Sequence, residues 1–213
     1  MKLYHCRDAR SLRPLWVLEE LALEYELVNL AFPPRVKHKD FLEINPLGTV
    51  PVFIEKESEN ENVLTESVAI CQYLADKYGS GALTIKPSDK EYGQYLNWLH
   101  RSDATYTFPQ TLVLRYQRFE PQERLQPQVV EDYKKWFYSR LRSLEAHLAH
   151  NDYLCANTFT IADICVSYAL FLAQALKIDQ PIGKNCKEYL ARLSQRKAFK
   201  SALAKQSELE LSF

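Results

Sequence analysis

Hydrophobic and polar positions divide the chain into two parts with different periodicities. In residues 1–78, short apolar runs that predict strands alternate with stretches of helical spacing. The strand-like runs are 2–6, 26–30, 50–54 and 63–65, and the helical stretches are 12–21, 39–44 and 67–78. The polar run 57–62 predicts a hairpin turn between the last two strands. The predicted order is β-α-β-α-β-β-α, with a parallel pair and an antiparallel edge.

After residue 88 the pattern is almost wholly helical. Apolar side chains recur at spacings of three and four residues, as in Phe137, Leu141, Leu144 and Leu148. This spacing is typical of an α-helical bundle. The expected helical runs cover 88–116, 122–150, 161–176 and two shorter segments within 184–205.

Two of the five glycines, Gly79 and Gly81, stand together and mark a linker. We therefore expect an α/β domain over 1–78, a linker over 79–88 and an all-α domain over 89–213. The net charge changes from −4 in residues 1–78 to +4 in the remainder, which is too small a difference to indicate a partner.

Composition narrows the possible functions. Hydrophobic residues make up 46% of the chain and charged residues 25%, as in folded globular proteins. The 27 basic residues balance 27 acidic ones, which disfavours a nucleic-acid partner. No apolar run reaches the roughly 20 residues of a membrane span, so no membrane partner is expected. The early charges are unlike a secretory signal, and five scattered cysteines suit reduced thiols in the cytoplasm, with no metal site.

Three segments at junctions between strands and helices contain candidate chemistry. In the first, residues 8–14, Ser11 is placed to cap the following helix through its hydroxyl. Such a helix terminus also offers N–H donors and partial positive charge, which lower the pKa of a thiolate held there. Ser11 is therefore either a cap alone or part of an anion site.

The second segment is Asn45-Pro46-Leu47-Gly48-Thr49-Val50-Pro51. A cis bond between Val50 and Pro51 would leave the Val50 backbone facing outward, ready to pair with an extended peptide. An ordinary trans proline at the start of a strand is the alternative.

The third segment contains Glu66 and Ser67, again between a strand and a helix. Ser67 and adjacent N–H groups suit a carboxylate, and Glu66 suits an ammonium group, so together they are complementary to an amino-acid moiety. A simple cap and a solvated charge are the alternatives.

Taken together, these segments resemble the cytosolic glutathione S-transferase superfamily. The matching stretches are Asn-Pro-x-Gly-x-Val-Pro, Thr-Glu-Ser-x-Ala-Ile, and residues 157–164, which look like the family's capping box with Thr160 and Asp163. The resemblance covers the whole chain. It implies a thioredoxin-like N-terminal domain followed by an all-helical domain, assembled as a homodimer.

The resemblance also implies a glutathione site. Val50 and Pro51 would hold the cysteinyl part, Glu66 and Ser67 the γ-glutamyl part, and Lys37 or His38 the glycyl carboxylate. Ser11 would be the catalytic partner of the thiol. Asp103 matches an acidic residue that contacts the glutathione amine across the interface of related dimers, although a local ion pair is an equal alternative.

The opening residues are similar, without gaps, to bacterial beta-class enzymes, which carry a cysteine where this chain has Arg10. Arg10 either adds positive charge beside the thiolate or projects into solvent. We count it with Tyr106, Phe108 and Gln110 as candidates for the electrophile pocket, with bundle core as the alternative for those three residues.

The implied function is a cytoplasmic glutathione transferase, in which glutathione is the co-substrate and its thiolate attacks a small electrophile. A disulfide or peroxide reductase is one alternative and would need a reactive cysteine, whereas Cys6 ends a strand where burial would make it inert. An isomerase and a non-catalytic scaffold of the same fold are the others.

Overall fold

The structure, a computed structural model, describes residues 1–58 and 60–206 and divides into two compact units. Residues 1–84 form the first unit together with the last described segment, 194–206, and residues 85–193 form the second. The division after Thr84 falls inside the predicted linker. The sequence predicts that residues 89–213 form one all-α domain, whereas residues 194–206 belong to the first unit. They do so because the last helix has an apolar face that packs on that unit, as described below.

The first unit is built on a four-stranded sheet in the order β2-β1-β3-β4. Its strands are β1 (Lys2–His5), β2 (Glu26–Asn29), β3 (Val52–Glu57) and β4 (Asn60–Leu64). β1 and β2 run parallel, whereas β3 is antiparallel to both β1 and β4. The predicted parallel pair and antiparallel edge are therefore confirmed.

The hairpin between β3 and β4 is tighter than the sequence predicts. Its polar residues belong to the strands, since Glu57 pairs with Asn60 and Glu55 with Asn62. The predicted hairpin is confirmed, but its turn is shorter than the polar run 57–62, because polar side chains on an edge hairpin can face solvent without breaking the ladder.

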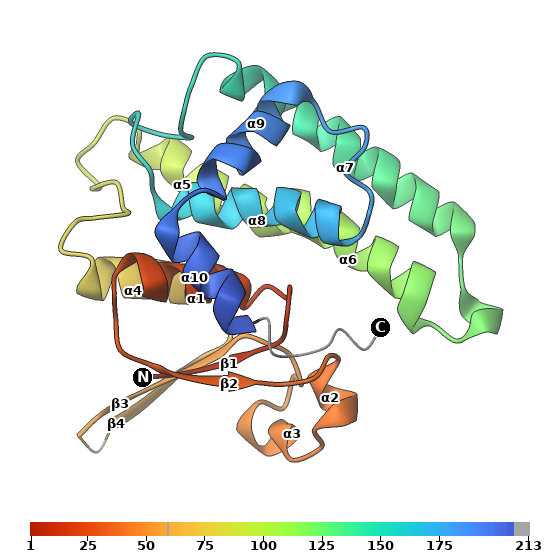
Figure 1. Cartoon of the computed structure of the whole chain (residues 1–213), viewed down its shortest axis with the longest axis horizontal. Helices are drawn as coiled ribbons and strands as arrows, with labels where there is room; N and C mark the ends of the chain where they lie inside the picture. Colours follow the sequence, from red (N-terminus) through yellow and green to blue (C-terminus); the bar gives the residue numbers. More distant parts are fainter. Residues whose placement is uncertain (59, 207–213) are drawn as a thin grey trace. The chain divides into compact units, whose positions relative to one another are not determined.

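Helices cover both faces of this sheet (Figure 1). On one face lie α1 (Leu12–Glu20), α4 (Ser67–Tyr78) and α10 (Lys197–Gln206), and on the other lie α2 (Pro34–Lys37) and α3 (Phe41–Ile44). The helix expected over 39–44 corresponds to α3, and α2 is a further short helix that precedes it. Helix α1 packs against both α4 and α10, and every residue from 12 to 18 is buried.

Helix α10 joins the first unit through apolar and ionic contacts with α1. Phe199 is buried, and the centroid of its ring lies 4.5 Å from the ring centroid of Trp16. Arg196 donates two hydrogen bonds to the Glu20 carboxylate, at 2.6 and 2.8 Å. Such bidentate pairs hold both position and orientation, so α10 is fixed along α1.

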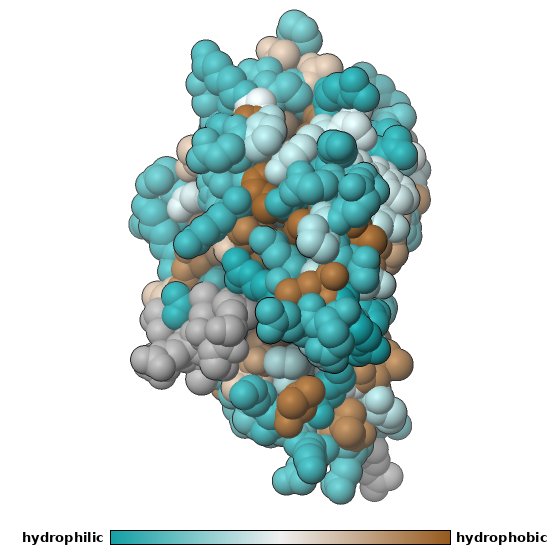
Figure 2. All heavy atoms as spheres, turned by 90° about the vertical axis from the view of Figure 1, so that its right-hand side faces the viewer, coloured by the Kyte–Doolittle hydropathy of each residue, from teal (hydrophilic) through white to brown (hydrophobic). Residues whose placement is uncertain are grey.

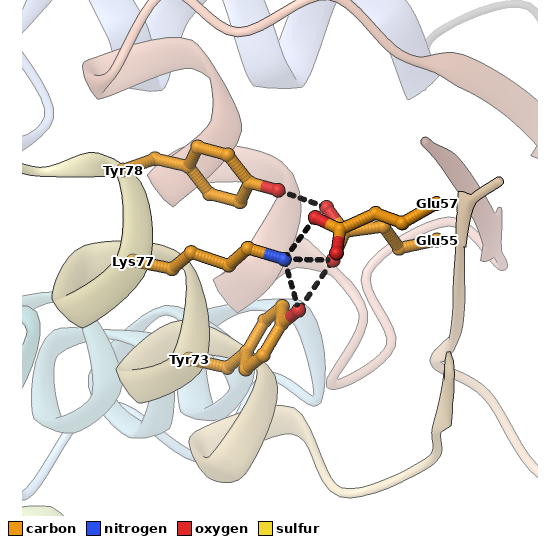
Figure 3. A network of polar contacts seen from close by, with 5 residues as sticks. All are labelled: Glu55, Glu57, Tyr73, Lys77 and Tyr78. Atoms are coloured by element: carbon orange, nitrogen blue, oxygen red, sulfur yellow. Dashed lines mark hydrogen bonds and ion pairs between the residues drawn. The ribbon is translucent and has the colours of Figure 1, made fainter. Parts of the chain in front are cut away.

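The C-terminal end of α4 is tied to β3 by a polar network (Figure 3). Lys77 donates to the buried Glu55 and to Tyr73, both at 2.8 Å, and also pairs with Glu57. The hydroxyls of Tyr73 and Tyr78 donate to Glu55 as well. Burial raises the pKa of Glu55, but these donors outweigh it and hold that pKa below its ordinary value. The network fixes the orientation of α4, which begins at Ser67.

The second unit is helical, as the spacing predicts. One long run combines α5 (Tyr92–Arg101), α6 (Phe108–Leu114) and the π-helical segments η1 (Ser102–Thr107) and η2 (Arg115–Phe119). The η1 segment ends two residues before Pro109, which has no N–H to continue an α-helical ladder. The other elements are η3 (Gln122–Arg124), α7 (Pro127–Leu148), α8 (Ile161–Ala175) and α9 (Lys184–Leu193).

Helix α8 begins with the predicted capping box. The Thr160 hydroxyl accepts from the Ala162 N–H at 3.2 Å, and the Asp163 carboxylate accepts from the Thr160 N–H at 2.8 Å. Asp163 also accepts from the Leu154 N–H and the Tyr189 hydroxyl. The box therefore connects the helix start to a loop and to α9, and the prediction is confirmed.

Hydrophobic side chains on the surface are separated by hydrophilic ones on the face drawn in Figure 2. Among residues 1–58 and 60–206, no helix is long and apolar enough to cross a membrane.

Candidate active site

Four loops of the first unit meet at one edge of the sheet. Tyr4 pairs with Val52, so the end of β1 lies beside the start of β3. Phe53 pairs with Leu64, which brings the end of β4 to that same edge, and the parallel pairing of His5 with Asn29 adds the end of β2. Every predicted site residue of this unit therefore follows or precedes a strand at this edge: Arg10, Ser11, Lys37, His38, Val50, Pro51, Glu66 and Ser67.

The Val50–Pro51 peptide bond is cis, as the first of the two sequence alternatives requires. Val50 lies two residues before the start of β3 and is half-buried. Among the described residues, the Val50 N–H and C=O make no hydrogen bond. This backbone can therefore pair with an added extended peptide.

Asn45 organises the turn that leads to Val50. Its side-chain amide donates to the Thr49 carbonyl at 2.8 Å, while its Oδ1 accepts from the Leu47 N–H at 3.1 Å. Gly48 adopts φ +61, and a Cβ there would come within 2.6 Å of the Arg35 Cβ. The turn thus requires both residues, which explains the Asn-Pro-x-Gly sequence.

Glu66 and Ser67 form the start of α4. Glu66 is the N-cap residue and is exposed, with no capping bond from its side chain. Ser67 is 2% exposed, and its Oγ accepts a hydrogen bond from Arg13 Nη1 at 2.9 Å. Arg13 lies on the buried face of α1 and is itself fully buried. The Arg13 guanidinium is thus hydrogen-bonded to Ser67, the serine that the sequence predicts to bind a carboxylate.

The loop between β1 and α1 turns Ser11 inward. Ser11 is fully buried, and its Oγ accepts from the Cys6 N–H at 3.3 Å and donates to the Cys6 carbonyl at 3.4 Å. It is the N-cap residue of α1 but makes no side-chain capping bond, so that part of the prediction was wrong. Its backbone is helical, at φ −63 and ψ −13, whereas a capping side chain usually needs an extended backbone.

The two candidates for the glycyl carboxylate differ in their surroundings. Lys37 ends α2 and is exposed. His38 is half-buried, and its Nε2 accepts from the Ala31 N–H at 2.9 Å. His38 therefore stabilises the loop after β2, and Lys37 is the one whose side chain extends toward solvent.

The candidates in the second unit do not share one environment. Asp103 is half-buried in η1, and Phe108 is 47% exposed. Tyr106 and Gln110 are buried, and burial raises the Tyr106 pKa. The Gln110 amide donates to the Tyr106 and Ala169 carbonyls at 3.0 and 2.9 Å. For Tyr106 and Gln110, these contacts match the bundle-core alternative.

The cysteines are all buried and unpaired by disulfides. Burial raises the pKa of Cys6 to about 12, so its thiol stays protonated at neutral pH. Among residues 1–58 and 60–206, no group of three His, Cys, Asp or Glu side chains is arranged to hold a metal ion.

Sequence reasoning missed Arg13 and Gln206. Arg13 is a charged residue within an otherwise apolar run of α1, which was a usable signal. Gln206 contacts His5 and Asp8 from 201 and 198 residues away, and nothing local in the sequence indicates that contact.

Known proteins match both parts of the chain. The glutathione S-transferase N-terminal domain model matches residues 1–76, and the C-terminal domain model matches 127–192. Glutathione S-transferase 3 of Zea mays is 30% identical over 199 residues, covering 88% of this chain and 86% of its own. This chain belongs to the glutathione S-transferase family.

Other relatives extend the match to nearly the full length. Glutathione S-transferase 3 of Schizosaccharomyces pombe is 27% identical and covers 99% of this chain and 89% of its own. The structure of a sphingomonad glutathione S-transferase complexed with glutathione has a TM-score of 0.84 and 25% identity, covering 98% of this chain and 100% of that one. This glutathione S-transferase therefore has the fold predicted for it.

Proposed function

We propose that this protein is a glutathione transferase whose glutathione site is the sheet edge described above. The observation that carries the proposal is the meeting, at that edge, of three features: the Val50 backbone, which makes no hydrogen bond within the described residues, the Glu66–Ser67 start of α4, and the start of α1. The three features match the three chemical parts of glutathione: an extended peptide, an amino-acid end and a thiol.

Each part has a defined partner in this proposal. The Val50 backbone pairs with the cysteinyl residue, Ser67 and the N–H groups of α4 bind the γ-glutamyl carboxylate, and Glu66 binds its ammonium group. Lys37 binds the glycyl carboxylate.

The reaction needs a thiolate. Partial positive charge at the start of α1 favours ionisation of the thiol, whose proton leaves to solvent. The sulfur then forms a bond with an electrophilic carbon, and the leaving group departs with its electron pair. Ser11 supports this arrangement by holding the loop through Cys6. For its hydroxyl to touch the thiol, it would first have to leave those bonds.

The beta-class-like character, with Arg10 in place of cysteine, belongs to the same proposal, supported by the ungapped likeness of the opening residues. We also propose a cytoplasmic homodimer. The five unpaired cysteines fit a reducing compartment, and light scattering after size-exclusion chromatography tests the dimer.

Calorimetric titration with reduced glutathione is the direct test. We expect saturable binding with one site per chain and glutathione-dependent turnover of an aromatic electrophile such as 1-chloro-2,4-dinitrobenzene. No heat at two temperatures, together with no turnover, would contradict the proposal and favour a scaffold role.

A further inference from the structure

The loop between β1 and α1 is held at one end of α10. Gln206 is the last described residue of that helix and is 3% exposed. Its Oε1 lies 3.0 Å from His5 Nε2 and accepts from the Asp8 N–H at 3.2 Å. Its Nε2 donates to Asp8 Oδ1 at 2.8 Å. One amide thus contacts both the end of β1 and the middle of the loop.

These contacts define the amide orientation and the histidine tautomer. The Asp8 N–H can only donate, so the atom facing it is the Gln206 oxygen. The amide nitrogen then faces the Asp8 carboxylate, which can only accept when ionised. Since the same oxygen faces His5, neutral His5 carries its hydrogen on Nε2. No other uncharged side chain of this length combines an oxygen that accepts from the Asp8 N–H with an N–H group that donates to the Asp8 carboxylate.

The helix that presents Gln206 is itself fixed. Arg196 and Phe199 hold α10 on α1, and Lys205 pairs with Glu19 at 2.5 Å. Because α10 is held in place, the hydrogen bonds of Gln206 also hold the six-residue loop 6–11, which ends at the start of α1. The left-handed backbone of Asp8, at φ +57, lies at the point of contact.

We propose that Gln206 is a positioning residue for the reaction: it holds the 6–11 loop so that the start of α1 faces the glutathione thiol. This inference rests on the proposed function. It assigns Gln206 no contact with glutathione, which in the proposed function binds to Val50, Glu66, Ser67 and Lys37.

The test compares Gln206→Leu, which removes both polar groups, with Gln206→Glu, which keeps the shape but puts a carboxylate beside Asp8. The matched control is Gln195→Leu, an exposed glutamine in the same C-terminal segment. Three quantities are measured for each protein: the glutathione Kd, kcat with 1-chloro-2,4-dinitrobenzene, and the pKa of the bound glutathione thiol from thiolate absorbance.

We expect both Gln206 variants to raise the bound-thiol pKa by about one unit and to lower kcat about tenfold, with less than a threefold change in Kd. Gln195→Leu should match the wild type. A folded Gln206 variant with unchanged thiol pKa and kcat overturns the inference, even if its melting temperature falls.

Two further outcomes are distinguishable. If Gln206→Leu does not fold, the near-isosteric Gln206→Glu decides by the same three measurements. If the wild-type protein itself neither binds glutathione nor turns over the electrophile, the proposed function fails, and the inference is overturned with it.

Discussion

Arg13 donates a hydrogen bond from Nη1 to the Ser67 Oγ, with a distance of 2.9 Å between these two atoms. Both side chains are buried. A guanidinium can only donate, so the Ser67 oxygen accepts and its own hydrogen is left to donate elsewhere. A hydroxyl that accepts from a cation is also a stronger donor. The pair therefore places a polarised hydroxyl at the start of α4.

Ser67→Ala should weaken glutathione binding about 10- to 100-fold, because a hydrogen bond to a charged group contributes ~1.5–3 kcal/mol. Calorimetry measures the Kd, with Ser88→Ala, an exposed serine, as the control. In the Ser67→Ala background, Arg13→Lys should change the Kd much less than it does alone. Additive losses would mean that Arg13 does not act through Ser67.

The positions of the site loops could be predicted from the sequence, whereas the side-chain orientations within them could not. The parallel pair and the antiparallel edge follow from alternation, and Asn45, Gly48 and Pro51 mark the turn locally, whereas the choice between a cis and a trans bond before Pro51 does not follow from the sequence. Ser11 was misjudged because its helical backbone directs the hydroxyl back to Cys6. Gln206 depends on packing between the two ends of the chain, which no local pattern encodes.

Alkylation of the native protein should leave it active. With a pKa of about 12, Cys6 and Cys155 are each about one part in ten thousand thiolate at pH 8, and all five cysteines are buried. Iodoacetamide at pH 8 followed by mass spectrometry should find no adduct, and the denatured protein should gain five. Rapid modification of Cys6 with loss of turnover would instead support the reductase alternative.

Asp163→Ala should destabilise the protein by ~3–5 kcal/mol, because it leaves the Thr160 and Leu154 N–H groups and the Tyr189 hydroxyl buried without their acceptor. Urea unfolding measures the loss. Thr160→Ser keeps a capping oxygen and should cost less than ~1 kcal/mol. Equal losses in the two variants would contradict a dominant role for the carboxylate.

Stability should fall as pH falls from 6.5 toward 4. Burial lowers the pKa of His5 to about 4, against hydrogen bonds that raise it, so the folded protein holds His5 neutral while the unfolded chain takes up a proton below pH 6.5. The stabilisation is fully present above pH 6.5 and is lost through this window, by up to ~3 kcal/mol at about 1.4 kcal/mol per unit.

His5→Gln isolates this contribution, because an amide can still donate to Gln206 but does not titrate. Urea unfolding between pH 7 and 4.5 should give a shallower decline for the variant than for the wild type. Parallel curves would show that carboxylates such as Glu55, whose pKa is lowered, dominate the decline instead.

The return of residues 194–206 to the first unit makes the helical unit an insertion within the α/β unit. During synthesis the ribosome releases the sheet and its first helices long before α10 emerges, while domains ordinarily fold in order from the N-terminus. The α10-facing surface of α1 must therefore stay uncovered until the whole helical unit and then α10 have been synthesised. A gene fragment that ends at the linker would encode an α/β unit permanently lacking its last helix.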